Sequence, residues 1–264
     1  MVGEVERPPT IVEIASDHIE RAIFAGELRM GEPLKEGPLM DAMNVSRGTV
    51  RQALNALQDR GLVDMIAHRG AFVADLSPIT VIETYTVRSL IEPYAAMLSF
   101  QEGSLDSTLA DHLKYLLGEM HLAEKTNDLE GITRFDVDFH YSILKASGHT
   151  VLLNIFRTLL ARTRLCMFQN ILLSGMPLSP NPHEHNEIIG AIVEGSPDIL
   201  VRLLCEHNMK ALDHFLSHKQ GVDAEATTYQ TKLMAQIPWL KLLDVLGPSM
   251  DGSQLMKSTD GAGR

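Results

Sequence analysis

Apolar residues recur every three to four positions over long stretches of this chain, and this spacing predicts a largely helical protein. Residues 11–25 form a first amphipathic segment, and residues 44–61 form a second one. From residue 79 onward the same periodicity continues with short interruptions. It predicts helices near 79–101, 105–126, 129–147, 149–174, 183–195 and 198–218. We expect these six helices to pack as an antiparallel bundle.

The stretch 44–61 has two faces of different chemistry. The apolar arc of its helical wheel contains Val50, Ala53, Leu54 and Leu57, and the neighbouring arc contains Arg47, Arg51, Asn55 and Gln58. Ser46 stands at the expected N-cap, and Gly61 stands where the helix is expected to end. Arginine and amide side chains can reach phosphates and base edges in a major groove. The stretch is therefore a candidate recognition helix, with an ordinary solvated face as the alternative.

The flanking segments favour DNA binding. A short helix is expected at 38–43, and a three-residue turn at 44–46 leads from it into the basic helix. Strand-like runs at 62–66 and 71–74 predict a hairpin. The turn between these two strands contains His68, Arg69 and Gly70. This order of elements is that of a winged helix-turn-helix, in which the hairpin reaches the groove beside the recognition helix. A solvated turn is the alternative for the tip.

Length and charge limit the partners. The 264 residues are enough for two domains. The net charge of −11 argues against a protein that coats nucleic acids without sequence preference. Residues 1–76 hold eight Lys and Arg against twelve Asp and Glu. The basic side chains that cluster in this region are Arg47, Arg51, Arg60 and Arg69. A local basic patch on an acidic protein suits a sequence-selective DNA-binding dimer.

The expected organisation is a DNA-binding domain at 1–76, a helical domain at 77–220 and a partly disordered extension at 221–264. Within that extension, residues 238–246 predict one or two amphipathic turns. No apolar run approaches the ~18–20 residues that span a membrane, and the N-terminus lacks a signal-peptide pattern. We therefore expect no membrane association and a cytoplasmic location.

Several short motifs follow one another in a characteristic order between residues 11 and 74. They are Gly26-Glu-Leu, Gly31 before Leu34, Val45-Ser-Arg, Thr49-Val-Arg-Gln-Ala-Leu, Leu57, Gly61-Leu-Val and Arg69-Gly-Ala-Phe-Val. With them the chain resembles the GntR family of bacterial transcription regulators. The resemblance implies DNA contacts from Arg47, Thr49, Arg51 and the wing at Arg69 and Gly70. Many relatives carry Glu-Arg-Glu-Leu in the second helix, where this chain has Glu36-Gly-Pro-Leu-Met40.

The predicted helix 129–147 places two polar residues on its apolar side. Asp136 and His140 are one turn apart, and burial of such groups costs several kcal/mol unless they are paired or ligated. His185 and His207 repeat this anomaly in two later helices. Together the four side chains suit a divalent transition metal such as zinc, nickel, manganese or iron. A hydrogen-bonded core network is the alternative.

Asp136-x3-His140, followed by His185 and His207, is also the pattern of the FCD effector domain, which residues 79–218 resemble. This resemblance implies a FadR-subfamily regulator with a metal-anchored pocket for a small carboxylate effector, homodimerisation and ligand control of DNA affinity. Arg88 is a candidate to bind the carboxylate, with a salt bridge to Glu92 as the alternative. Arg162 is a further candidate.

We therefore expect a protein that is mostly α, with a winged helix-turn-helix followed by a helical bundle, and that acts as a repressor on double-stranded operator DNA. Two other functions use the same residues. The first is a metalloenzyme with the Asp and three His at its active site, but the sequence identifies no acid or base beside them. The second is a regulator whose metal is purely structural.

Overall fold

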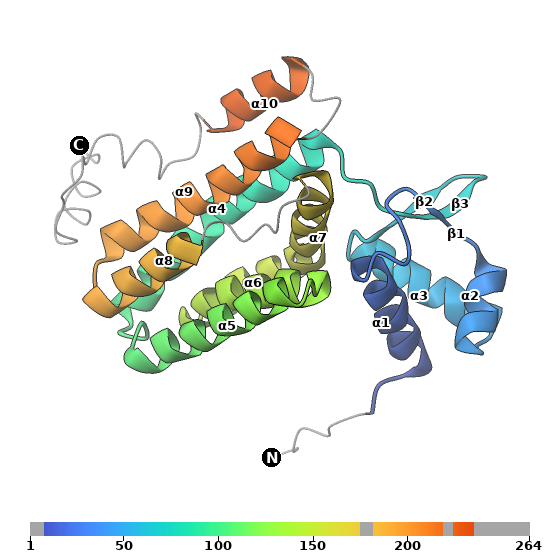
Figure 1. The fold of residues 1–264 in the computed structure, drawn as a ribbon, viewed down its shortest axis with the longest axis horizontal. Helices are drawn as coiled ribbons and strands as arrows, with labels where there is room; N and C mark the ends of the chain where they lie inside the picture. The colour runs from blue at the N-terminus through green and yellow to red at the C-terminus, as the bar shows by residue number, and fades with distance from the viewer. Residues whose placement is uncertain (1–7, 175–181, 219–223, 235–264) are drawn as a thin grey trace. The chain divides into compact units, whose positions relative to one another are not determined.

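The computed structural model describes residues 8–174, 182–218 and 224–234, which are helical apart from one small sheet and short connections (Figure 1). The predicted mostly α fold is confirmed. The chain divides into two compact units between Asp75 and Leu76. No helix in the described ranges is long and apolar enough to cross a lipid bilayer.

The first unit contains three helices and three strands. They are α1 (Ile11–Phe24), β1 (Pro33–Leu34), α2 (Glu36–Met43), α3 (Arg47–Asp59), β2 (Val63–Ile66) and β3 (Gly70–Val73). Asn44 adopts a left-handed conformation, with φ of 51°, at the end of α2. This residue lets the chain turn into α3, where the Ser46 Oγ accepts a hydrogen bond from the Thr49 amide at 3.2 Å. The buried face of α3 packs on α1, as the apolar arc predicts.

The sheet has the order β1-β3-β2, and both strand pairs are antiparallel. The sequence pattern predicts the β2–β3 hairpin but not β1, in which Leu34 pairs with Ala71. The hairpin closes with a hydrogen bond from the Arg69 amide to the Ile66 carbonyl. Gly70 has a φ of 96°, the positive value that its place in the turn predicts. Helix α2 begins at Glu36 and is therefore two residues longer than predicted.

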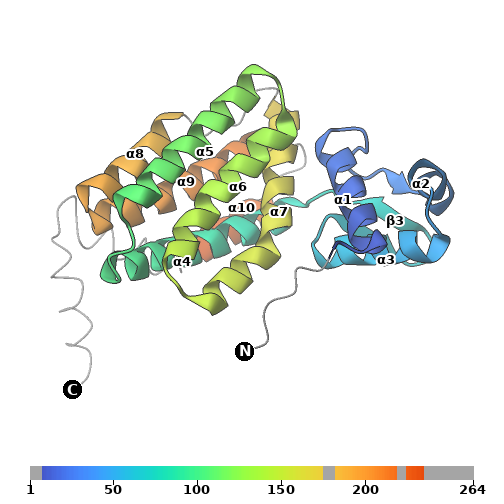
Figure 2. The ribbon, with the colours of Figure 1, turned by 90° about the horizontal axis from the view of Figure 1, so that it is seen from below.

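The second unit is a helical bundle. Its helices are α4 (Pro78–Gln101), α5 (Ser107–Lys125), α6 (Leu129–Ala146), α7 (Thr150–Ser174), α8 (Pro182–Glu194), α9 (Pro197–His218) and α10 (Ala224–Met234). Helix α4 packs along α9, and α5 packs along α6 (Figures 1 and 2). The first six helices match the predicted ones, whereas α10 was not predicted. Tyr229 of α10 donates a hydrogen bond to the Glu83 carboxylate of α4 at 2.8 Å. The turns predicted at 238–246 lie outside the described residues.

The apolar core of this unit determines which face of α6 is buried. Phe139 and Ile143 of α6 belong to one cluster with residues of α5, α8 and α9, including Leu113, Ile188 and Leu204. Asp136 and His140 lie on the same side of α6 as Phe139 and Ile143, because residues three and four positions apart share a face. The apolar packing therefore carries these two polar side chains into the interior.

Helices α4 and α9 are also joined by a sulfur contact that depends on Pro93. Because proline has no amide hydrogen, the carbonyl of Ser89 one turn earlier has no donor at that position of the helix. The Cys205 thiol lies 3.8 Å from this carbonyl and donates to it. Cys166 and Cys205 are both free and buried, and burial raises the pKa of each thiol to about 12. Both residues therefore remain protonated thiols at neutral pH.

Candidate metal centre and DNA interface

Asp136, His140, His185 and His207 converge inside the second unit. Helix α6 contributes the first two side chains, α8 contributes His185, and α9 contributes His207. One potential ligand atom from each residue lies within 4.8 Å of the others, and none of the four side chains is more than 3% exposed. The structure thus brings together all four residues that the sequence pattern singled out.

The ring nitrogens and carboxylate oxygens of this group face one another. The Nε2 atoms of His140 and His207 are 3.2 Å apart, and His185 Nε2 lies 3.2 Å from Asp136 Oδ1. Three imidazoles and one carboxylate at such distances form a donor set that fits a divalent transition metal. These four residues could therefore hold a divalent metal, as the sequence pattern suggested.

The protonation states of His207 and Asp136 suit metal binding. Burial lowers the pKa of His207 to about 4, despite the opposing effect of a hydrogen bond with Glu184. For Asp136, burial alone would raise the pKa, but contacts with the three histidines hold it well below its usual range. At neutral pH, His207 is thus neutral and Asp136 is ionised, which are the forms that coordinate metals.

Two carboxylates contact the outer nitrogens of these histidines. Glu92 Oε2 of α4 lies 2.8 Å from His140 Nδ1, and Glu184 Oε2 of α8 lies 3.1 Å from His207 Nδ1. Lys210 in turn lies 2.9 Å from the other oxygen of Glu184. The sequence pattern points to Glu92 only as a partner for Arg88 and does not point to Glu184. No sequence signal identifies Glu184, because its contact depends on how α8 packs against α9.

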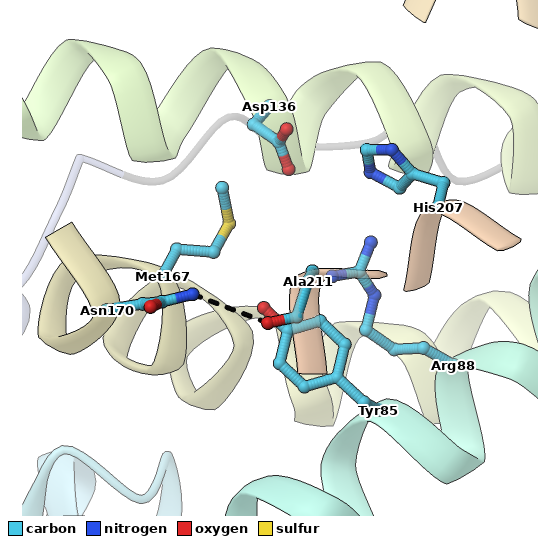
Figure 3. A pocket seen from close by; sticks show the side chains of 7 residues that line it. All are labelled: Tyr85, Arg88, Asp136, Met167, Asn170, His207 and Ala211. Atoms are coloured by element: carbon cyan, nitrogen blue, oxygen red, sulfur yellow. Dashed lines mark hydrogen bonds between the residues drawn. The ribbon is translucent and has the colours of Figure 1, made fainter. Parts of the chain in front are cut away.

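A small pocket, with room for about one water molecule, opens beside Asp136 and His207 (Figure 3). Its lining residues are Tyr85, Arg88, Asp136, Met167, Asn170, His207 and Ala211. The Asn170 side chain donates a hydrogen bond to the Ala211 carbonyl at 3.4 Å. Arg162, which the sequence also proposed for effector binding, is not among the lining residues. Tyr85, Met167 and Asn170 were not singled out from the sequence, since their convergence depends on the packing of α4 and α7.

Arg88 is 1% exposed, and its guanidinium points toward the space between Asp136 and His207 (Figure 3). Its Nε donates to Glu92 Oε1 at 2.6 Å. Its Nη2 has no hydrogen-bond partner among the described residues. The two interpretations of Arg88 are therefore compatible, because the salt bridge with Glu92 occupies only part of the guanidinium.

The predicted DNA-contacting residues lie on α3 and at the hairpin. Arg47, Arg51 and Asn55 of α3 are exposed, whereas Thr49 is half-buried, with its hydroxyl 2.9 Å from Ser46 Oγ. At the hairpin, the exposed residues are His68, Arg69 and Gly70. The Arg69 guanidinium lies over the Phe72 ring, 5.2 Å from its centroid.

The basic surface of α3 includes one acidic contact that the sequence did not reveal. Glu36 of α2 lies with one oxygen 3.4 Å from Arg47 Nε and with the other 3.4 Å from Arg51 Nε. Arg60, which the sequence grouped with these arginines, instead pairs with Glu20 of α1. Three of the four arginines that the sequence grouped therefore contact a carboxylate, and Arg47 and Arg51 share the same one.

Comparison with known families assigns both units. The family of bacterial regulatory proteins named gntR matches residues 12–73, and the FCD domain matches residues 83–210. The chain belongs to the GntR family of transcription regulators. The presence of an FCD domain fits the FadR subfamily, and the four clustered Asp and His residues lie within it.

Relatives of this GntR regulator include a protein named "Probable D-xylose utilization operon transcriptional repressor" from Paenarthrobacter nicotinovorans. It is 25% identical over 217 residues, which cover 81% of this chain and 93% of the relative. The Glc operon transcriptional activator of Escherichia coli (strain K12) is 29% identical over 226 residues, which cover 76% of this chain and 87% of the relative. These domains and relatives are transcription regulators and not enzymes.

The fold of this GntR regulator also resembles that of a solved GntR structure from Rhodococcus sp. RHA1. The TM-score is 0.69 at 22% sequence identity, and the similarity covers 79% of this chain and 99% of that one. Escherichia coli McbR/YncC has a TM-score of 0.67 at 16% identity, and the similarity covers 80% of this chain and 99% of that one. At these identities the similarity establishes the fold.

If the candidate site binds a metal, zinc should stabilise the protein and this effect should depend on His185. Zinc added to chelator-treated protein is expected to raise the melting temperature, since a ligand at 100 times its Kd stabilises the folded state by about 2.7 kcal/mol. His185→Ala should abolish this rise. His183→Ala is the matched control, because His183 lies on the same helix but is exposed and contacts Glu187. An equal rise in the His185 variant, measured by thermal unfolding, would show that zinc binds elsewhere.

Proposed function

We propose that this GntR regulator is a homodimeric repressor that binds its operator through α3 and the hairpin wing. Its DNA affinity is controlled by a small carboxylate effector bound at a divalent metal held by Asp136, His140, His185 and His207. The observation that carries the proposal is the buried Arg88 Nη2, which has no partner among the described residues and points into a pocket beside the four ligand residues.

The chemistry of the pocket favours an anion. A metal at this group supplies open coordination positions for a carboxylate oxygen. Arg88 remains charged despite its burial, because Glu92 and other nearby groups outweigh the effect of burial and raise its pKa. Its remaining N–H donors suit the second oxygen of the same carboxylate. Met167 also lines the pocket, and its flexible side chain can shift to admit a ligand larger than water.

The placement of the site provides a route for control. The four ligand residues connect α6, α8 and α9, and Glu92 adds α4 through its contact with His140. Helix α4 begins at Pro78, directly after the boundary between the two units at Asp75 and Leu76. An effector that binds one arrangement of these helices more tightly shifts the population toward it. A purely structural metal is the second candidate, and it would leave Arg88 without a ligand to bind.

Dimerisation is supported by exposed apolar residues on the bundle. Val151 and Ile155 lie one turn apart on α7 and are 60% and 42% exposed, and Tyr94 on α4 is also exposed. A two-fold dimer also places two recognition helices on two half-sites, which gives more selectivity than a single winged helix. We infer a repressor because a dimer bound at a promoter most simply blocks transcription, and several relatives are named as repressors.

Loss of Arg47 or Arg51 is expected to weaken operator binding while the fold is retained, since both side chains are exposed. Loss of a base-contacting arginine should cost about 1–3 kcal/mol, or roughly 5- to 140-fold in affinity. Gel shifts with upstream DNA would compare Arg47→Ala and Arg51→Ala with Arg21→Ala, which removes the same charge from α1. If the three variants bind alike, α3 is not the recognition helix.

The oligomeric state gives an independent prediction. Sedimentation equilibrium at micromolar protein concentration should yield twice the 29.2 kDa mass of the chain. A monomeric mass, together with specific operator binding by the same preparation, would contradict the dimer.

Control by a carboxylate can be measured as release of DNA. A panel of small carboxylic acids should include a compound that weakens operator binding by the zinc-loaded protein, and the effect should disappear in His140→Ala. Typical coupling free energies of about 1–3 kcal/mol predict a change of roughly 5- to 150-fold. If zinc binds but no acid in the panel alters DNA affinity, the structural role of the metal becomes the better explanation. A reporter fused to the target promoter measures the sign of regulation.

A further inference from the structure

One buried carboxylate contacts both halves of the proposed effector site. Glu92 Oε1 accepts a hydrogen bond from Arg88 Nε at 2.6 Å, and Glu92 Oε2 lies 2.8 Å from His140 Nδ1. Arg88, Glu92 and His140 are each no more than 1% exposed. The two oxygens of a single side chain are therefore divided between a cation that faces the pocket and a histidine that faces the metal centre.

Each contact restricts the orientation of its partner. A carboxylate at Nδ1 of a ligating histidine fixes the ring so that Nε2 faces the metal, and it makes that nitrogen a better ligand. His140 Nε2 does face the group, because it lies 3.2 Å from His207 Nε2. On the other side, the contact at Nε leaves the terminal nitrogens of Arg88 directed toward the pocket, and Nη2 has no hydrogen-bond partner among the described residues.

We propose that Glu92 is the positioning residue that couples the metal centre to the anion-binding arginine. The inference rests on the proposed function, because it assumes a metal at the Asp and His group and an anion at Arg88. With both partners held by one buried side chain, the metal and Arg88 present a defined spacing to the two ends of a bound carboxylate. Binding of the metal and binding of the anion then strengthen each other, since each fixes the carboxylate that the other needs.

Glu184 provides a natural comparison within the same site. Its carboxylate lies 3.1 Å from His207 Nδ1, as Glu92 does for His140, but its second oxygen contacts Lys210 rather than Arg88. Lys210 is largely exposed and does not line the pocket. Substitution of Glu184 should therefore affect the metal without affecting the arginine, whereas substitution of Glu92 should affect both.

The experiment uses the purified full-length chain and two probes, zinc and acetate. The first measurement is zinc affinity, by competition with a coloured chelator, and the second is the rise in melting temperature caused by acetate at saturating zinc. The variants are Glu92→Gln, Glu92→Asp and Glu184→Gln. Glu92→Asp keeps the charge that compensates Arg88, and it shortens the side chain by one methylene so that both contacts cannot persist. It therefore tests the proposal even if Glu92→Gln does not fold.

All three variants are expected to bind zinc about 10- to 100-fold more weakly than the wild type. The acetate-induced rise should be lost in the Glu92 variants and retained in Glu184→Gln. Unchanged zinc affinity in the Glu92 variants would overturn the link to His140, and an unchanged acetate response would overturn the link to Arg88. A wild-type chain that fails to bind zinc, or fails to respond to acetate, would instead contradict the proposed function and the coupling with it.

Discussion

Burial of ionised side chains is tolerated only where each one has a partner, and this requirement determines how the helices of the second unit meet. Burial alone would raise the pKa of Glu92, but Arg88 and His140 lower it to about 2. Asp136 is held ionised in a similar way by the histidines around it. These contacts join α4, α6, α8 and α9. The apolar cluster brings the helices together, and the polar network at its edge restricts their register, because a shift of one helix would leave a buried charge unpaired.

The sequence revealed the residues of the candidate metal centre because they violate a pattern. Asp136 and His140 occupy positions where the helical period calls for apolar side chains, and His185 and His207 do the same. Arg88 and Glu92 were also visible, as an i,i+4 pair, but a pattern cannot show that one carboxylate serves two partners. Glu184 and the remaining pocket residues, Tyr85, Met167, Asn170 and Ala211, were not predictable. Their roles depend on contacts between helices, which periodicity within one helix does not encode.

The same distinction applies to the fold. Helices longer than about three turns have enough periodic positions to be predicted from one sequence, and α4 to α9 were. Strand β1 has only the residues Pro33 and Leu34, so it has no alternation to detect, and its pairing with β3 spans a large separation in the chain. Helix α10 is short, and threonine and tyrosine weaken its helical signal. The sequence pattern thus missed one element that depends on pairing with a distant strand and one whose own helical signal is weak.

The acidic net charge and the proposed DNA contacts are reconciled by the environment of α3. The side chains of Arg47 and Arg51 are 68% and 70% exposed, so their contacts with Glu36 are weak and can be exchanged for contacts with DNA. Because Glu36 contacts both arginines, its negative charge opposes the approach of phosphates to them. That repulsion opposes every DNA sequence alike, whereas hydrogen bonds from the two arginines to base edges form only on a matching site. The carboxylate therefore lowers the affinity for matching and nonmatching sites alike and leaves discrimination to the arginines, which suits a regulator that must find one operator among many competing sites.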